Sequence, residues 1–329
     1  MYDLLDMTCL PVDVIMKMNT TFPVAGDQIF SLEDMQLEPG GSGNLFVLFT
    51  RLGGTVLPVA PIGDDIYGKW MKDVYEEIGI ETKGLILTEG YRTQVAHCLV
   101  DTNGVHTFLS TLPSVEYGTE EQIRALTDEC KSFYLSGYSL AGDKHLVMIQ
   151  RCVDTVRRFY QEGKSVFFDT GPRVKDIDPA ILNEIVEKSQ IVCLNHQEAY
   201  AFTGCDEVEK AAQKISEKTK GMVVVKDGAN GCYVNKEDSK KWYPGFKVKK
   251  VDTIGAGDSF FSAMIYGYLN DWDMDDMVIV ANAAGAMKTS KAGSGRNVPT
   301  PKEIQNLLKE NGYMWIQEGT KVILQKEDM

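Results

Sequence analysis

Short apolar runs alternate with longer segments of helical periodicity over most of this chain, and this alternation constrains the fold more than any other feature. Short apolar runs rich in β-branched residues predict strands, whereas apolar residues that recur every three or four positions predict helices. Alternation of the two is typical of a mostly parallel sheet with helices on its faces, so the sequence predicts an α/β fold. The expected core strands are 55–60, 132–136, 165–169, 191–194 and 222–226, and the expected helices are 44–52, 67–78, 145–162, 179–189, 197–204, 207–218, 259–269, 274–290 and 301–311.

Two segments, near residues 14–37 and 85–112, break this alternation and have the pattern of short strands joined by turns. Residues 101–104 (Asp-Thr-Asn-Gly) are a hairpin signal. Ligands of open α/β sheets bind beyond the carboxyl ends of the strands. We therefore expect a single domain over residues 1–329, with these segments inserted in it as a small β-sheet lid over the site. The apolar residues after Asn311 predict one last strand.

Charge and cysteine content exclude several function classes. The net charge of −13 argues against a nucleic-acid or anionic-membrane partner, because both require a basic face. The seven cysteines are odd in number and contain no C-x-x-C pair, as expected of reduced thiols, and they predict no zinc site. No apolar run approaches the roughly 18 residues of a membrane span, and the first residues lack the basic start of a signal peptide. We therefore expect a cytoplasmic protein.

Residues 252–258 (Asp-Thr-Ile-Gly-Ala-Gly-Asp) form the most informative motif for function, because a helical pattern follows them directly. Free N–H groups at a helix start and the positive end of its dipole favour a phosphate, and glycines let a ligand approach the backbone. Asp258 by itself could be the N-cap of that helix. A second acid, Asp252, and the two glycines favour a general base beside an anion hole, which is the arrangement for phosphoryl transfer without a P-loop.

Two further glycine-rich segments are candidates for ligand binding. Residues 40–44 (Gly-Gly-Ser-Gly-Asn) open a helix, and either bring the backbone and Asn44 close to a polyol or form a plain loop. Residues 63–70 resemble a Walker A motif, but Trp70 replaces the Ser or Thr that would bind magnesium and two acids would repel phosphates. We interpret 63–70 as a surface turn.

Polar residues follow three of the expected strands. Asn195 and Glu198 lie on one helical face. They either bind a magnesium ion through water molecules or form a capping box. Lys226 ends a strand and offers charge to phosphates, and Gly228 would let a nucleotide approach the backbone. Arg173 is either an anion contact or a surface residue.

In their order along the chain, these motifs resemble those of the ribokinase-like (PfkB) family of carbohydrate kinases, and the resemblance covers nearly the whole chain. Residues 252–258 resemble its carboxy-terminal signature, and residues 40–44 together with 51–53 (Arg-Leu-Gly) resemble its amino-terminal signature. Asn195 and Glu198 resemble its N-x-x-E motif. The resemblance implies a three-layer sandwich with a mostly parallel central sheet and a small β-sheet lid.

The same resemblance implies an enzyme that transfers the γ-phosphoryl group of ATP, with Mg²⁺, to a hydroxyl of a small sugar of the ribose, fructose or 2-keto-3-deoxygluconate type. Asp258 would be the base, Gly255, Ala256 and Gly257 the anion hole, and Asp13, Gly40, Gly41 and Asn44 the sugar site. ATP would contact Asn195, Lys226, Gly228, Gly231 and Asn282. Glu198 would bind the magnesium ion through a water molecule. A monovalent cation such as K⁺ would lie at Asp252, Ile254, Lys288, Lys291, Gly293 and Asn297.

The sequence departs from the family pattern near the sugar site, where Thr8 replaces the usual glycine five residues before Asp13 and Leu10-Pro11 replaces more polar residues. These departures leave the substrate open. A kinase of a sugar phosphate or nucleoside, and a non-catalytic sugar or nucleotide sensor, are the alternatives. A homodimer through the lid is expected by analogy.

Overall fold

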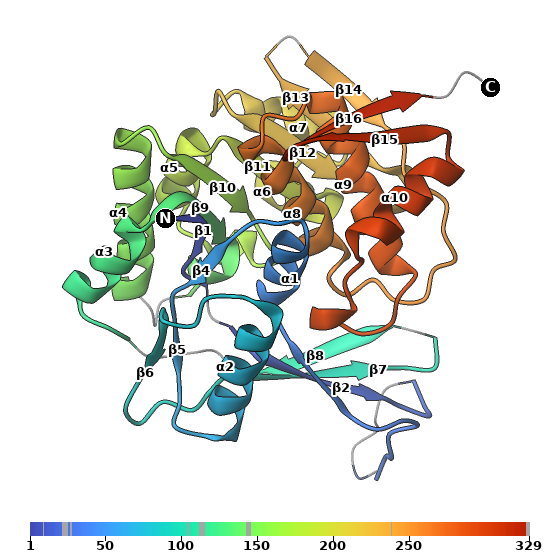
Figure 1. The fold of residues 1–329 in the computed structure, drawn as a ribbon. Helices are drawn as coiled ribbons and strands as arrows, with labels where there is room; N and C mark the ends of the chain where they lie inside the picture. The colour runs from blue at the N-terminus through green and yellow to red at the C-terminus, as the bar shows by residue number, and fades with distance from the viewer. Residues whose placement is uncertain are drawn as a thin grey trace.

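The computed structural model describes residues 1–8, 10–21, 26, 28–103, 105–111, 116–142, 146–237 and 239–326. Its centre is an eight-stranded sheet in the order β14-β13-β12-β11-β10-β9-β1-β4 (Figure 1). Six of these strands are parallel, and β13 and β14 extend the sheet as an antiparallel pair. The expected α/β fold is confirmed. The strands are β1 (Tyr2–Asp6), β4 (Val56–Pro58), β9 (Cys130–Ser136), β10 (Ser165–Asp169), β11 (Ile191–Asn195), β12 (Met222–Lys226), β13 (Cys232–Lys236) and β14 (Ser239–Tyr243).

Helices cover both faces of the sheet, and each face has its own apolar cluster. On one face pack α1 (Gly43–Arg51), α2 (Ile66–Ile78), α8 (Ala256–Leu269), α9 (Met274–Thr289) and α10 (Pro301–Glu310). On the other face pack α3 (Glu120–Asp128), α4 (Leu146–Gln161), α5 (Pro179–Lys188), α6 (His196–Thr203) and α7 (Val208–Ser216). The parallel strands of the central sheet have continuous apolar sequences because both faces of the sheet are buried under helices.

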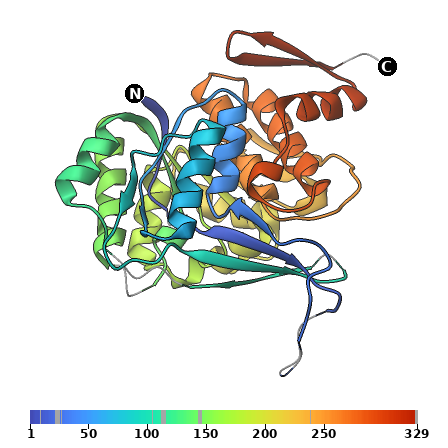
Figure 2. The same cartoon turned by 60° about the horizontal axis from the view of Figure 1, so that its bottom comes forward.

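Three predictions about strands were incomplete. The expected strand 55–60 is divided: β4 joins the central sheet, and the chain then turns away so that β5 (Ala60–Ile62) pairs with β6 (Leu85–Leu87). Strands β13 and β14 were not predicted; β14 has the polar sequence Ser-Lys-Lys-Trp-Tyr and lies at the sheet edge. The tail after Asn311 contains two strands, β15 (Tyr313–Glu318) and β16 (Lys321–Lys326), which form a separate hairpin beside α10 (Figure 2).

A second, four-stranded sheet forms from the segments that break the alternation. Its order is β3 (Gln36–Pro39), β2 (Val12–Lys17), β7 (Val95–Val100) and β8 (His106–Ser110), and Figure 1 shows it below the central sheet. The predicted β7–β8 hairpin is present, although Gly104 of its turn lies outside the described residues. Cross-strand register places Asp13 beside Ala96, and Ala96 beside Ser110. Because side chains alternate along a strand, these three share one face of the sheet.

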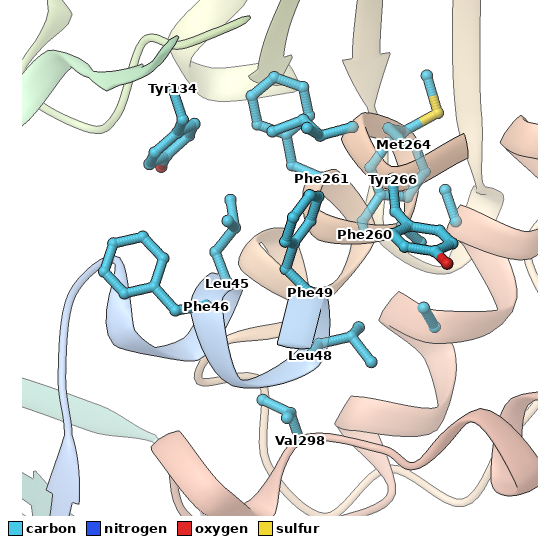
Figure 3. Close-up of a cluster of buried hydrophobic side chains, with 14 of the residues drawn as sticks. Leu45, Phe46, Leu48, Phe49, Tyr134, Phe260, Phe261, Met264, Tyr266 and Val298 are labelled. Carbon is cyan, nitrogen blue, oxygen red and sulfur yellow. The ribbon is translucent and has the colours of Figure 1, made fainter. Parts of the chain in front are cut away.

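Packing between α1 and α8 positions the two glycine-rich motifs. Leu45 and Phe49 of α1 lie in one buried cluster with Phe261 and Met264 of α8, and the Phe49 ring meets Tyr266 of α8 edge to face (Figure 3). A hydrogen bond of 3.0 Å from the Ser262 hydroxyl to the Leu45 carbonyl also joins the helices. Each motif lies at the amino-terminal end of its helix, so this contact brings the two motifs together.

Candidate active site

A cavity of about 470 Å³ is lined both by residues at the carboxyl ends of the central strands and by residues of the four-stranded sheet. Eleven of the candidate residues from the sequence line it: Asp13, Gly41, Asn44, Arg173, Asn195, Glu198, Lys226, Ile254, Gly255, Gly257 and Asp258. These residues come from segments separated by more than 200 positions in the chain. The fold therefore brings the acid, the glycine-rich turns and the basic strand end to one space.

The turn before α8 has the geometry of an anion-binding site. Helix α8 begins at Ala256, and its N-cap is Gly255, whose φ of 72° lies in the left-handed region that favours glycine. A Cβ atom at Gly255 would lie 2.9 Å from the Asn44 Oδ1 atom, so the two motifs are in close contact. Asp258 is the third residue of the helix, and the alternative in which it is the N-cap is wrong. Its Oδ2 atom instead accepts a 3.1 Å hydrogen bond from the Asn44 side chain.

The environment of Asp258 makes its carboxylate basic. Burial, and secondarily the negative charge of Asp169, raise the pKa of Asp258 to about 6, while the Lys226 charge and the Asn44 hydrogen bond oppose the shift. Such a group is mostly ionised at neutral pH and accepts a proton more readily than an exposed aspartate. These are the properties of a general base.

Asp13 and the glycine-rich turn form a second polar group in the cavity. The Asp13 Oδ2 atom accepts a 2.8 Å hydrogen bond from the Ser294 hydroxyl. Burial raises the pKa of Asp13 to about 7; the Ser294 hydrogen bond opposes the shift, and the charge of Asp258 adds to it. Gly40 is required here for space, because a Cβ atom at that position would collide with the Asp13 carboxylate.

Sequence reasoning missed the segment that supports these side chains. Ser294 contacts Asp13, and the Gly295 N–H donates a 2.6 Å hydrogen bond to the Asn44 Oδ1 atom. Both residues lie more than 250 positions from their partners. The only local signal is the Gly-Ser-Gly run at 293–295, which has no distinctive pattern by itself.

At the other end of the cavity, Asn195 and Glu198 form a capping box at the start of α6. The same Glu198 carboxylate lines the cavity, where it also accepts a 3.3 Å hydrogen bond from the Thr170 hydroxyl. Burial, followed by the charge of Asp169, raises the pKa of Glu198. Lys226 forms an ion pair of 3.3 Å with Asp169, a partner that the sequence did not reveal. The capping-box alternative is therefore confirmed, and it leaves the carboxylate facing the cavity.

The three remaining candidates for nucleotide contact differ in their surroundings. Gly228 has a φ of 56° and open space where a Cβ atom would lie. Gly231 has a structural reason to be glycine, because a Cβ atom there would collide with the Tyr243 carbonyl. The buried Asn282 side chain faces the end of β14, where it donates a 3.5 Å hydrogen bond to the Tyr243 carbonyl.

The expected cation ligands lie behind the anion-binding turn. The two carboxylate oxygens of Asp252 accept 2.9 Å hydrogen bonds from the N–H groups of Ile254 and Gly293. The Lys288 side chain is fully buried, and its ammonium donates a 3.1 Å hydrogen bond to the Lys291 carbonyl. Asn297 donates through its side chain to the Ser294 carbonyl at 3.1 Å.

Clusters of metal-binding side chains and membrane-spanning helices are both absent from the described part of the chain. No group of three or more His, Cys, Asp or Glu side chains there is arranged to hold a metal ion. Within the same residues, every helix is too short or too polar to cross a membrane.

Several known sugar kinases are similar to this chain over most of its length. Fructokinase-1 of Zea mays is 27% identical over 87% of this chain and 93% of its own length. A 5-dehydro-2-deoxygluconokinase of Clostridium botulinum is 28% identical over 82% of this chain and 84% of its own. An ATP-dependent ribose-1-phosphate kinase of Halopiger xanaduensis is 26% identical over 91% and 95%.

Solved structures give the same result for the fold. Ribokinase from Thermotoga maritima superposes with a TM-score of 0.76 at 25% identity, covering 94% of this chain and 100% of its own. A fructokinase from Xylella fastidiosa, solved with bound ATP, gives 0.76 at 20% identity over 94% and 98%. The ribokinase-like architecture that the motifs implied is therefore confirmed. The family model described as pfkB family carbohydrate kinase matches residues 11–301, and this chain belongs to that family.

Proposed function

We propose that this protein transfers the γ-phosphoryl group of ATP to a hydroxyl of a small sugar. One observation carries the proposal: Asp258, with its raised pKa, lies in the first turn of α8, and Asp13 and Lys226 line the same cavity. A proton acceptor, an anion-binding turn and a cation are the groups that phosphoryl transfer requires.

In the proposed mechanism, the acceptor sugar is held by Asp13, Asn44 and the backbone of Gly40 and Gly41. Asp258 accepts the proton of the attacking hydroxyl. The N–H groups of Gly255, Ala256 and Gly257 hold the negative charge of the phosphoryl group as it is transferred. The hydrogen bond from Asn44 to Asp258 keeps the base aligned with the sugar site.

The residues at the ends of β11 and β12 fit a nucleotide with magnesium. Open space beside Gly228 lets a nucleotide approach the backbone, and Lys226 offers charge to its phosphates. Asn195, Gly231 and Asn282 would complete this side of the site. Mg²⁺, when bound, neutralises phosphate charge, and because it keeps most of its waters, the single carboxylate of Glu198 is enough to orient it.

The four-stranded sheet is proposed as a lid on a single domain. The residues of this sheet that line the cavity are Asp13, Ala96, His106, Phe108 and Ser110. Closure over the sugar would exclude water, which otherwise competes with the sugar hydroxyl for the phosphoryl group.

The cavity wall bears on the class of acceptor. Lys17, one of two basic candidates for binding a sugar phosphate, forms a 2.7 Å ion pair with Glu33. The other, Arg92, lines a separate hollow. The side of the cavity near β1 and α4 is largely apolar, with Met7, Ala141 and Met148. Sugar hydroxyls find few partners there. A nucleoside, whose base is apolar on its faces, is therefore the second candidate acceptor.

The test of the proposal is ADP release by the wild type and by Asp258→Asn, over a panel of ribose, fructose, 2-keto-3-deoxygluconate and nucleosides. Loss of the base is expected to lower turnover by roughly 10²–10⁴-fold while ATP binding stays close to that of the wild type. Asp154→Asn, a change at an exposed acid of α4, is the control and should retain activity. An active Asp258→Asn enzyme would refute the base assignment. Sugar binding without turnover by the wild type across the panel would support the sensor alternative.

A further inference from the structure

Lys288 is a buried lysine that the mechanism does not use. It lies in the last turn of α9, its side chain has no exposed surface, and its ammonium donates a 3.1 Å hydrogen bond to the Lys291 carbonyl. A buried charge is costly unless it is paired, so its position requires a reason. Burial lowers the pKa of Lys288; the negative charge of Asp252 opposes that shift, the positive charge of Lys291 adds to it, and the charge of Asp258 opposes it.

The contacts around Lys288 connect it to the anion-binding turn. The carbonyl of Thr289, the next residue, accepts hydrogen bonds from the N–H groups of Val251 and Asp252 at 2.8 and 3.1 Å. The Asp252 carboxylate bridges Ile254 in the turn to Gly293 in the loop after α9. The Lys288 hydrogen bond therefore fixes the start of the loop after α9. Thr289 and Gly293, on either side of Lys291 in the chain, contact Asp252 next to the anion-binding turn.

The same loop continues to the sugar site. Ser294 and Gly295 follow Gly293 and bind Asp13 and Asn44 directly. A displacement of the loop after Lys288 would therefore change both the anion-binding turn and the acceptor side chains.

These contacts do not fit the monovalent cation that the family resemblance implied. A K⁺ ion would need the carbonyl of Lys291, which already accepts the Lys288 hydrogen bond. The Asn297 side chain presents its amide N–H₂ group to the loop, since it donates to the Ser294 carbonyl. A second positive charge beside a buried ammonium would also be repelled.

We propose that the Lys288 ammonium is a tethered cation that replaces an exchangeable monovalent ion behind the anion-binding turn. Lys288 is a positioning residue in this proposal, since it touches neither the sugar nor ATP. It holds the 291–295 loop through the Lys291 carbonyl and offsets the charge of Asp252. The consequence is an enzyme whose activity and stability do not depend on K⁺. The kinetic part of this inference rests on the proposed sugar kinase function.

The first experiment uses the wild-type protein and needs no catalysis. Its thermal unfolding midpoint is measured in choline chloride and in potassium chloride at equal ionic strength. A ligand that binds only the folded state raises the midpoint by mass action. We expect the same midpoint in both salts, and a clear rise in K⁺ would overturn the proposal.

The second experiment replaces the tethered charge. Lys288→Ala removes the ammonium and leaves room for an ion, whereas Lys288→Met removes the charge but still fills the space. In choline chloride both variants are expected to lose turnover by about 10²-fold, the scale of losing one electrostatic contact to the anion site. Added K⁺ should restore much of this loss, and raise the unfolding midpoint, in Lys288→Ala but not in Lys288→Met. The control is Lys188→Met, a half-buried lysine paired with Glu184 on α5, which should show neither effect.

The outcomes separate this inference from the proposed function. Strong K⁺ activation of the wild type, or a Lys288→Ala enzyme fully active in choline chloride, would overturn the tethered-cation proposal and leave the kinase proposal intact. A wild type that phosphorylates nothing would refute the kinase proposal, and the unfolding measurements would still decide the role of Lys288. If Lys288→Ala does not fold, the wild-type comparison between the two salts still decides.

Discussion

Asp13 and Asp258 are two buried carboxylates whose pKa values are both raised, to about 7 and about 6. Each has burial as its main cause, and the charge of Asp258 raises the pKa of Asp13 further. The two residues also have separate partners, Ser294 and Asn44. Their ionisation should therefore be visible in the pH dependence of catalysis.

We expect kcat/KM for the sugar to fall as the pH decreases through about 7 and then about 6, with both acids protonated at the low end. The value of kcat/KM falls at low pH because protonated Asp258 cannot accept a proton from the sugar hydroxyl. Protonated Asp13 is also a weaker hydrogen-bond acceptor for a sugar hydroxyl. The measurement is kcat/KM from about pH 5 to about pH 9, for the wild type and Asp13→Asn. The variant should have lower kcat/KM throughout and keep only the ionisation of Asp258 near its pKa of about 6, because Asp13 is largely protonated at that pH and does not raise it. An acid limb that stays flat down to about pH 5 would contradict this prediction.

Residues with a local signature could be predicted from the sequence, and residues defined by long-range contacts could not. Asp258, Asn44 and Glu198 stand in short motifs at helix starts, and all three line the cavity. Ser294 and Asp169 acquire their meaning only from partners elsewhere in the chain. The sequence placed Lys288 among the cation ligands, but only the fold shows that its own ammonium lies there.

At the level of elements, the packing of α1 on α8 determines the geometry of the site. Phe261 of α8 is fully buried and meets Tyr134 of β9 edge to face, with ring centroids 5.9 Å apart. It lies one turn from Asp258, near the surface that α1 covers (Figure 3). A change in this packing should move Asp258 relative to Asn44.

We expect Phe261→Ala to lower the free energy of unfolding by about 3–5 kcal/mol, because it removes a buried aromatic ring and leaves a cavity. It should also lower kcat of the folded protein. The control is Phe159→Ala on α4, where an equally buried ring packs on Phe133 in the cluster of the opposite face. Urea unfolding and steady-state kinetics should show similar stability losses for the two variants but a kcat loss only for Phe261→Ala. Equal kcat in both variants would show that α8 keeps its position without this ring.

The elements that the sequence predicted well have a strong apolar pattern. The apolar runs of β10, β11 and β12 and the composition of α8 reflect burial of most of their residues, whereas α4 has a regular apolar period because one of its faces is buried. Edge strand β14 and the hairpin β15–β16 face solvent on one side, so polar residues weaken their pattern. The division of 55–60 between β4 and β5 depends on pairing with β6, which no local pattern indicates.

At the scale of the whole molecule, the four-stranded sheet and the connection between its strands β2 and β3 expose several large apolar side chains. Phe30, Leu32 and Met35, in the connection between β2 and β3, are 60% or more exposed, and Leu109 on β8 is 52% exposed. Leu109 pairs with His97 across the sheet, and alternation places both on the face opposite to Phe108, which lines the cavity. Exposed apolar groups gathered on one side of a molecule mark interaction surfaces. We propose that a second copy of this chain covers this face, so that the lid sheets pair in a homodimer.

Leu109→Asp tests this assembly, because a carboxylate at the centre of an apolar interface is unpaired and desolvated. We expect the wild type to sediment as a dimer and the variant as a monomer at the same concentration. Met314→Asp, on the exposed strand β15 of the C-terminal hairpin, introduces the same charge away from the lid and should remain dimeric. A lid that a partner steadies should also close more readily, so the monomeric variant should have a higher KM for the sugar and an unchanged KM for ATP. A wild type that is monomeric at all accessible concentrations would exclude the homodimer, and the lid would then have to close over the sugar without support from a second chain.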